Sequence, residues 1–302
     1  MHEPGPRNIS ASMTKRKRPG GQRPPAPRAQ GQGSGQNQKT SPDQGDFRRR
    51  PRPHGTARPH KGSHKGADDE GFLYGFHAVT AALQNPARKP QRLLLTRNAE
   101  SDLAALGLNL GRNLPLQPEI ASGEEIAALL PPGAVHQGIA LKTTPLPDLT
   151  LDEACEDAAR VVVLDQVTDP HNFGAILRSA AVFGAGALVT TDRNSPPLGG
   201  VLAKAASGGL ERVKIARVTN LVRALDDLKD LGFEVIGLDG EGEVSLPEFK
   251  TGPKVALVLG AEGAGLRRLT REHCDILARL PASGEMRSLN VSNAAAVALY
   301  EL

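Results

Sequence analysis

The sequence predicts an α/β protein in which a parallel sheet covered by helices follows a smaller α/β domain. Short runs rich in Val, Ile and Leu recur in the second half of the chain, and such runs are typical of strands buried on both faces of a parallel sheet. Helical stretches separate them, and strands that alternate with helices form parallel sheets. The 302 residues also leave room for a second domain and a long unstructured segment.

Residues 1–67 are predicted to be a disordered basic arm. They hold almost no aliphatic side chains, so they cannot bury enough apolar surface to offset the entropy of ordering. They carry 15 Lys and Arg residues against three acidic ones, a net charge of +12, whereas the remainder has 22 basic and 30 acidic residues, a net of −8. This segregation favours a polyanionic partner that the arm tethers. A solubilising tail is the alternative, and the many Pro and Gly residues disfavour an organelle transit peptide.

Composition disfavours several other classes of protein. The chain has no run of about 18 apolar residues, which a membrane span would need. It also has no charged N-terminal segment followed by an apolar core, which a secretory signal would have. It is therefore expected to be cytoplasmic, with no membrane span. Cys155 and Cys274 lie far apart and outside any Cys-x-x-Cys pattern, so neither a disulfide framework nor a metal site is expected. Both cysteines are expected to be inert packing residues.

Residues 71–144 are predicted to form the smaller α/β domain, because helical and extended patterns alternate along them. Its predicted elements are helix 76–84, strand 92–95, helices 100–106 and 124–130, and strand 139–142. Residues 145–158, which open with Pro145 and Pro147, are predicted to be a linker.

Residues 159–302 are predicted to form the parallel sheet and its covering helices. The predicted strands are 161–164, 187–190, 214–216, 234–238, 255–259 and 276–280, and the predicted helices are 175–183, 201–207, 221–231 and 292–302. Ligands of open parallel sheets bind at the carboxyl ends of the strands, so chemistry is expected in the segments that follow them. Three such segments are unusual.

The first segment, DQVTDPHNFGAILRSA, directly follows strand 161–164. Asn172 is expected to cap a helix, and Arg178 is expected in the second turn of that helix among small apolar residues. A cation in such surroundings favours an anionic ligand. The alternative is a buried ion pair of Arg178 with Asp165 or Asp169.

The second segment, GAEGAGL, follows strand 255–259. Its glycine spacing is not the dinucleotide-binding fingerprint, because Glu262 stands in the place of the second glycine, and a nicotinamide-dependent oxidoreductase is therefore disfavoured. The glycines allow close approach of the backbone to a ligand, and Glu262 adds one carboxylate.

The third segment, LPASGEMRSLNVSNAAAV, leads into the C-terminal helix. Four hydrogen-bonding side chains, those of Ser288, Asn290, Ser292 and Asn293, surround a helix start that needs only one cap. Capping alone does not account for them.

Together the three segments resemble the SpoU (TrmH-type) family of RNA ribose methyltransferases, within the knotted SPOUT class. DPHNFGAILRSA, LGAEGAGL and SGEMRSLNVSNAAAV occur in the family's order. The preceding domain, from LYGFHAV to HQGI, is similar to the substrate-binding domain of the branch that modifies a guanosine of 23S rRNA. The resemblance implies an L30e-like fold for residues 71–144 and a trefoil knot for residues 159–302.

The resemblance also implies transfer of a methyl group from S-adenosylmethionine to a ribose 2′-hydroxyl of RNA, most closely a guanosine of 23S rRNA. By matched position it implies the catalytic residues Asn172, Arg178, Glu262, Ser288 and Asn290. The implied cofactor-binding residues are Gly260, Leu280 and Leu289, with Leu238, Asp239 and Gly240 as weaker candidates. A guanidinium is effectively always protonated, so Arg178 is expected to hold the target phosphate and stabilise the developing alkoxide, not to act as a base.

RNA and a second copy of the chain are the expected partners. The resemblance implies a homodimer, and the small residues 294–298 suit close contact between helices. Local RNA contacts are expected from basic residues of the first domain, with solvated surface as the alternative reading: Arg88, Lys89, Arg92 and Arg97.

Two other functions stay open. One is the same reaction on transfer RNA, because the catalytic segments do not encode the substrate. The other is an inactive RNA-binding or ribosome-assembly factor, which the intact set of catalytic residues disfavours. The sequence departs from the family pattern at Ala261, where Asn or Ser is more usual, and at residues 280–282, where Ile-Pro-Met is more usual.

Overall fold

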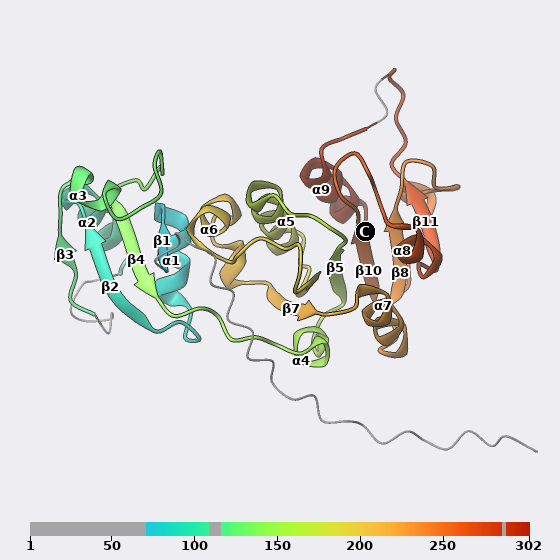
Figure 1. Cartoon of the computed structure of the whole chain (residues 1–302), viewed down its shortest axis with the longest axis horizontal. Helices are drawn as coiled ribbons and strands as arrows, with labels where there is room; N and C mark the ends of the chain where they lie inside the picture. Colours follow the sequence, from blue (N-terminus) through green and yellow to red (C-terminus); the bar gives the residue numbers. More distant parts are fainter. Residues whose placement is uncertain (1–70, 109–115, 286–287) are drawn as a thin grey trace, which may run out of the picture. The chain divides into compact units, whose positions relative to one another are not determined.

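The computed structural model describes residues 71–108, 116–285 and 288–302, so the predicted basic arm, residues 1–67, lies outside the described residues. The described chain forms two sheets (Figure 1). A four-stranded sheet lies between Phe72 and Thr143, and a seven-stranded sheet lies between Arg160 and Arg279. No helix of the described part of the chain is long and apolar enough to cross a membrane.

The first sheet has the strand order β1-β4-β2-β3. Strand β4 pairs antiparallel with β1 and β2, and β2 pairs parallel with β3. Its elements are β1 (Phe72–Tyr74), α1 (Phe76–Gln84), β2 (Pro90–Leu95), α2 (Arg97–Ala105), β3 (Glu119–Ile120), α3 (Gly123–Ala127) and β4 (Ile139–Thr143). The five elements predicted here are present with small shifts of their ends. Strands β1 and β3 were not predicted, because three and two residues are too short to show a periodicity.

The second sheet has the strand order β7-β6-β5-β10-β8-β11-β9, and every pair in it is parallel, as predicted. Its strands are β5 (Arg160–Leu164), β6 (Ala187–Thr191), β7 (Lys214–Val218), β8 (Glu234–Leu238), β9 (Val244–Ser245), β10 (Val255–Leu259) and β11 (Ile276–Arg279). All six predicted strands are present. The two-residue strand β9 was not predicted.

Helices cover both faces of this sheet, because alternate residues of a strand point to opposite faces. Val162 and Leu164 of β5 belong to one core with the helices α5, α6 and α9. Val161 and Val163 belong to a second core with α4 and α7. The helices, with two 3-10 turns, are α4 (Leu151–Cys155), α5 (Pro170–Val182), α6 (Gly200–Ala206), η1 (Gly209–Glu211), α7 (Leu221–Asp230), η2 (Leu246–Glu248), α8 (Arg268–Glu272) and α9 (Val291–Glu301). Helix α4 lies in the segment that was predicted to be a linker.

Helix α5 begins earlier than predicted, and its cap is not Asn172. The side chain of Asp169 accepts the backbone N–H of Asn172, with N and Oδ2 2.9 Å apart, so Asp169 is the N-cap. Pro170 follows at the first helical position, where its missing N–H is not needed and its fixed φ suits the helix. Asn172 therefore lies inside the first turn, and Arg178 lies in the third turn instead of the second.

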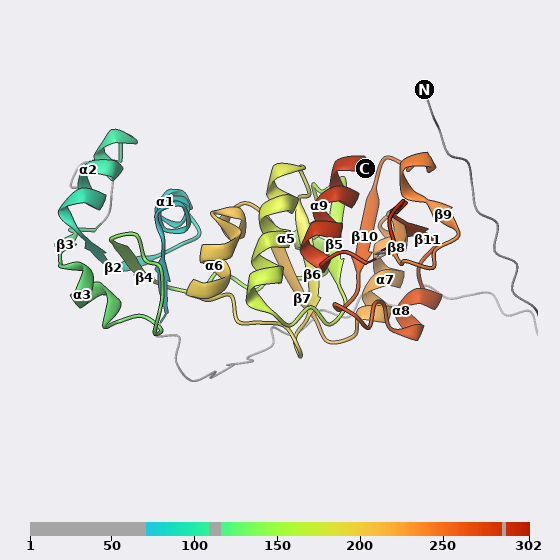
Figure 2. The same ribbon diagram turned by 90° about the horizontal axis from the view of Figure 1, so that it is seen from above.

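The last helix, α9, returns to pack beside α5, as both views show (Figures 1 and 2). Ala295, Ala298 and Leu299 of α9 are buried in the same core as Phe173 and Leu177 of α5. The end of the chain is held as well, because the guanidinium of Arg160 donates to the backbone oxygen of Leu302. The trefoil knot that the resemblance implies stays a prediction.

Candidate functional site

Three residues that were predicted as catalytic meet at the start of α5. The side-chain amide of Asn290 donates to Oδ1 of Asn172 at 3.0 Å and to Oε2 of Glu262 at 3.4 Å. The amide of Asn172 donates to the same carboxylate oxygen at 3.3 Å. We call these three residues, which come from all three unusual segments, the amide–carboxylate cluster. Its two amide donors orient one carboxylate at the surface, where Glu262 is exposed.

The cap of α9 determines how Asn290 is oriented. Asn290 is the N-cap residue, and its Oδ1 accepts the backbone N–H of Ser292 at 2.9 Å and the Ser292 hydroxyl at 2.6 Å. Because Oδ1 is fixed by these two donors, the Nδ2 group has to point toward Asn172 and Glu262. The surplus of polar groups at this helix start is explained in part, since Ser292 holds the residue that completes the cluster.

A tight turn presents Glu262. Ala261 and Gly265 exchange two backbone hydrogen bonds, of 3.1 and 2.9 Å, which close the turn on itself. Gly263 and Gly265 have φ of 80° and 67°, a region that side chains disfavour. A Cβ on Gly260 would lie 2.1 Å from the carbonyl carbon of Gly265. Each of these glycines is thus required by the turn itself, and Glu262 stands near its tip.

An ion pair with a buried carboxylate joins the first segment to the residue that follows the second. The Asp165 side chain is fully buried, and its Oδ1 lies 2.6 Å from Nε of Arg267 while its Oδ2 accepts the backbone N–H of Arg267 at 3.1 Å. Asp165 therefore pairs with Arg267, and Asp169 caps α5. The alternative reading, in which Arg178 pairs with one of these two aspartates, is wrong. Sequence reasoning missed Arg267, although it stands just after the glycine-rich segment.

Five of the six predicted cofactor residues lie along one edge of the sheet. Strands β10, β8 and β11 are consecutive neighbours and parallel, so their carboxyl ends lie side by side. Gly260 follows β10, Leu238–Gly240 ends and follows β8, and Leu280 follows β11. Leu238 and Leu280 are partly buried against the core, and nothing would meet a Cβ on Gly240. This edge is where ligands of open parallel sheets bind.

The other predicted site residues differ in their surroundings. Asp239 already has protein partners: its carboxylate pairs with Arg271 at 3.0 Å and accepts the N–H of Glu241 at 2.9 Å, and its own N–H and C=O are bonded within the fold. Ser288 is exposed, and Leu289 is 55% exposed, unusual for a leucine. Both precede the cap of α9.

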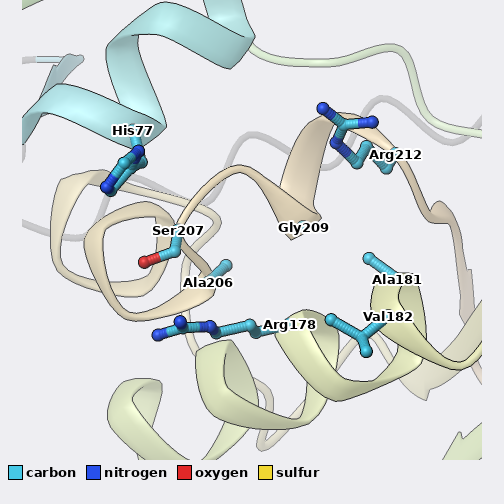
Figure 3. A pocket seen from close by; sticks show the side chains of 8 residues that line it. All are labelled: His77, Arg178, Ala181, Val182, Ala206, Ser207, Gly209 and Arg212. Carbon is cyan, nitrogen blue, oxygen red and sulfur yellow. The ribbon is translucent and has the colours of Figure 1, made fainter.

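Arg178 is exposed and lies apart from the amide–carboxylate cluster. It stands six residues after Asn172 on α5, about 9 Å along a helix axis. Its side chain lines a surface hollow of about 360 Å³, which His77, Ser207 and Arg212 also line (Figure 3). The structure therefore brings Asn172, Glu262 and Asn290 together and places Arg178 in a separate, cationic environment.

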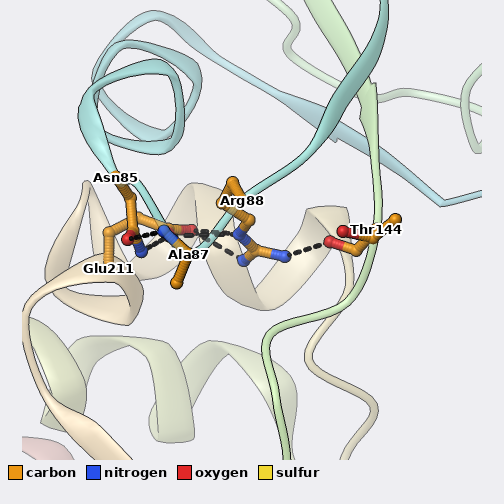
Figure 4. Close-up of polar contacts among 5 residues, drawn as sticks. All are labelled: Asn85, Ala87, Arg88, Thr144 and Glu211. Carbon is orange, nitrogen blue, oxygen red and sulfur yellow. Dashed lines mark hydrogen bonds and ion pairs between the residues drawn. The ribbon is translucent and has the colours of Figure 1, made fainter.

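A second ion pair, in which both side chains are buried, connects the two sheets. Arg88 is 6% exposed, and its Nη2 lies 2.7 Å from Oε1 of Glu211, which follows α6 in η1 (Figure 4). The amide of Asn85 donates to Oε2 of the same carboxylate at 2.6 Å, and Arg88 also donates to the backbone oxygen of Thr144 at 3.0 Å. The prediction that Arg88 contacts RNA is wrong, because its guanidinium is buried and paired with Glu211.

The remaining basic residues predicted to contact RNA are accessible. Arg92 forms an ion pair with Glu119, with Nη2 and Oε2 2.7 Å apart, and both side chains are well exposed. Lys89 and Arg97 are exposed as well. These three residues stay candidates.

Neither cysteine is activated. Burial raises the pKa of the Cys155 thiol to about 11 and that of the Cys274 thiol to about 12, so neither is a thiolate near neutral pH. This agrees with the prediction of packing residues. Among the residues that the structure describes, no group of three or more His, Cys, Asp and Glu side chains is arranged to hold a metal ion.

Two family models match the chain. That of the SpoU rRNA Methylase family matches residues 159–300, and that for RNA 2′-O ribose methyltransferase substrate binding matches residues 72–149. Among curated proteins, the chain is 38% identical over 246 residues to 23S rRNA (guanosine-2′-O-)-methyltransferase RlmB of Escherichia coli K12, an alignment that covers 76% of this chain and 96% of the relative. It is 39% identical over 236 residues to the RlmB of Pseudomonas putida, covering 76% and 94%.

Solved structures share the fold at lower sequence identity. The SpoU methyltransferase AviRb from Streptomyces viridochromogenes in complex with AdoMet aligns with a TM-score of 0.62 at 22% identity, over 76% of this chain and 88% of that one. An AdoMet-bound rRNA methyltransferase from Sinorhizobium meliloti aligns with a TM-score of 0.63 at 23% identity, over 76% and 85%.

The buried pair of Arg88 and Glu211 predicts a large loss of stability when one partner is neutralised. Glu211→Gln leaves the Arg88 guanidinium buried without a charged partner, and we expect the free energy of unfolding to fall by about 3–5 kcal/mol in urea titrations. Glu272→Gln, which removes the exposed pair with Arg268, is the control and should cost less than about 1 kcal/mol. Equal small losses for both variants would contradict the assignment.

The amide–carboxylate cluster predicts that Asn290→Asp is destabilising in a pH-dependent way. The new carboxylate keeps the cap acceptor but stands beside Glu262, so the two like charges should cost about 1–3 kcal/mol at pH 7. Two adjacent carboxylates hold a shared proton to higher pH than the unfolded chain does. The loss in the free energy of unfolding relative to the parent protein should therefore shrink as pH falls toward about 4. Thermal unfolding at both pH values measures it. Asn220→Asp, at the N-cap of α7, is the control and should be neutral or slightly stabilising at pH 7; matching behaviour of the two variants would refute the cluster.

Proposed function

The chain belongs to the SpoU rRNA methylase family, and we propose that it transfers a methyl group from S-adenosylmethionine to the ribose 2′-hydroxyl of a guanosine in 23S rRNA, in the cytoplasm. The observation that carries the proposal is the amide–carboxylate cluster, in which three segments distant in sequence converge at the carboxyl edge of the parallel sheet. The match of residues 72–149 to a substrate-binding model and the identity to RlmB support ribosomal RNA as the substrate.

S-adenosylmethionine fits the edge formed by the ends of β10, β8 and β11. Gly260, Gly240 and Leu280 offer backbone groups there, and Leu238 offers an apolar side chain. We assign the exposed Leu289 as a further apolar contact of the cofactor. Asp239 is the weakest of the proposed contacts, because its polar groups are already bonded. When bound, the cofactor supplies an electrophilic methyl group on a sulfonium centre.

The chain's own residues then have to align the ribose hydroxyl and manage its proton. Asn172 and Asn290 both donate to Oε2 of Glu262, and these two hydrogen bonds fix the direction of that carboxylate. We assign Oε1 of Glu262 to accept a hydrogen bond from the ribose hydroxyl, with Ser288 beside it. Alignment of this kind can contribute several kcal/mol to catalysis.

Arg178 is assigned to the phosphate of the target nucleotide. It is exposed, its alternative aspartate partners are engaged elsewhere, and its fork of donors suits a phosphate. From there it stabilises negative charge that develops on the reacting oxygen. It does not serve as the base, since a guanidinium keeps its proton.

The first test is methyl transfer itself. Incubation with methyl-labelled S-adenosylmethionine and unmodified large-subunit rRNA should place the label in alkali-resistant dinucleotides, because a methylated 2′-oxygen cannot attack the adjacent phosphate. Arg178→Lys keeps the charge but loses the bidentate geometry, and we expect turnover to fall about 10- to 100-fold, the equivalent of 1.5–3 kcal/mol. Arg223→Lys, at an exposed position on α7, should keep full turnover.

Other outcomes of that assay point elsewhere. Label in transfer RNA but not in rRNA would shift the substrate assignment while the reaction stands. Cofactor binding without transfer to either RNA would favour an inactive RNA-binding factor. Near-full turnover of Arg178→Lys would refute the bidentate phosphate role.

We also propose that the chain forms a homodimer through α9. Val297 and Tyr300 of α9 are 43% and 73% exposed, and contiguous exposed apolar side chains mark interaction surfaces. The Tyr300 ring stands edge-on to Phe183 with ring centroids 6.0 Å apart, which extends the surface toward the end of α5.

Light scattering at micromolar concentration should therefore give the mass of a dimer. Tyr300→Glu should give a monomer, because it buries a charge in the proposed contact. Leu269→Ser, which removes a leucine on α8 that is 50% exposed, should remain dimeric. A monomeric parent protein would sink this proposal.

A further inference from the structure

We propose that the hollow beside Arg178 is a subsite for the RNA backbone, in which His77 and Arg212 act with Arg178 to hold successive phosphates next to the target nucleotide. This inference rests on the proposed function and assigns a role to two residues outside the three unusual segments. It makes the hollow a place at which the RNA backbone touches both parts of the chain. His77 belongs to α1 of the first domain, and Arg178 and Arg212 belong to the second domain.

The charge of the hollow favours an anion. Three of the described residues that line it carry basic groups, Ser207 adds a hydroxyl, and none of the lining residues is acidic. Arg178, Arg212 and His77 are all exposed, so their donors face solvent (Figure 3). Residues 68–302 have a net charge of −8, so a basic hollow among them gives a polyanion a defined place to bind.

The acidic group closest in sequence does not cancel this charge. Glu211 directly precedes Arg212, but its carboxylate is directed to Arg88 and Asn85, with Oε1 2.7 Å from Arg88 Nη2. The Glu211 side chain is only 4% exposed. The same buried contact that joins the two sheets thus leaves Arg212 free of its neighbour's charge.

The hollow is built by tight backbone packing, so the backbone that carries its basic groups is held in place. A Cβ on Gly209 would lie 2.7 Å from the backbone oxygen of Leu177, so η1 rests directly on α5. Gly208 has φ of 94°, and a Cβ there would lie 3.0 Å from Cβ of Ala81 on α1. Ser207, which ends α6 in the left-handed region with φ of 48°, completes the turn. Helices α1 and α5 are therefore held against one turn, at the residues that flank the basic groups.

An RNA phosphate suits this arrangement better than a nucleobase. The apolar side chains between the basic groups are those of Ala181, Val182 and Ala206, and among the described lining residues the His77 imidazole is the only aromatic ring for stacking. Arg and His donors to a phosphate fix the register of the nucleic acid without reading its sequence. The subsite would therefore position the strand, while the choice of nucleotide is made elsewhere.

The test compares Arg212→Ala and His77→Gln with the parent protein and with Arg223→Ala, which removes an arginine that is 81% exposed on α7. Affinity for an rRNA fragment that carries the target is measured by fluorescence anisotropy between about 50 and 300 mM KCl. Loss of one phosphate contact on a single strand should reduce the slope of log affinity against log salt by about 0.7. We expect this for Arg212→Ala, a smaller reduction for His77→Gln, and no change for Arg223→Ala.

Kinetics and a conservative variant separate this role from a structural one. Arg212→Ala should raise the KM for RNA with little change in kcat, and it should leave S-adenosylmethionine binding and the melting temperature unchanged. Arg212→Lys keeps the charge and should restore the parent's salt slope. Salt slopes and KM values of Arg212→Ala and His77→Gln that match those of Arg223→Ala would overturn the subsite.

The outcome also distinguishes the subsite from the proposed function. Methyl transfer by the parent protein with an unchanged slope for Arg212→Ala leaves the function intact and removes the subsite. A reduced slope without methyl transfer to any RNA supports the subsite and removes the proposed reaction. A parent protein that binds no RNA overturns both.

Discussion

The parallel pairing of β5 with β10 at the centre of the large sheet is the constraint on which the site depends. Leu164 and Leu259 end the two strands opposite each other, and the backbone N–H of Asp165 continues the ladder by donating to the oxygen of Leu259 at 2.8 Å. Two segments that lie far apart in the sequence therefore leave the sheet at one point. The ion pair of the buried Asp165 with Arg267 then holds them together beyond the last strand residue. Without this register, Asn172 and Glu262 would not meet.

The third member of the cluster depends on the path of α9. Its buried face packs beside α5, which carries the helix start to the carboxyl edge of the sheet, and the cap at that start is Asn290. One side chain thus completes two tasks, because its oxygen caps the helix while its amide donates to Asn172 and Glu262. The stability of α9 and the orientation of the site are therefore linked. A change that weakens the cap of α9 also turns the Asn290 amide away from Asn172 and Glu262.

Some arginines of this protein are held in ion pairs, and others are left exposed for a ligand. Arg88 and Arg267 are each bonded to a buried carboxylate and serve the fold. Arg178 and Arg212 are exposed beside one hollow that has no acidic lining residue, and they are available to a ligand. A count of charges cannot make this distinction, because all four arginines look alike until their neighbours are known.

Local patterns in the amino-acid sequence predict the layered α/β fold, the elements with a clear periodicity, and the three segments that carry the cluster. Apolar runs and helical spacing are local signals, so they are legible along the chain. The short strands β1, β3 and β9 carry too few residues for such a signal. The predicted N-cap of α5 was wrong because Asp169 and Asn172 are both residue types that cap helices well. Asp169 is the cap because Pro170 occupies the first position of the helix. The tertiary structure alone decided that Arg88 is buried, that Asp165 pairs with Arg267, and that Arg178 shares a hollow with His77 and Arg212. These are contacts between segments distant in the sequence, and they follow from strand register and helix packing, which no local pattern encodes.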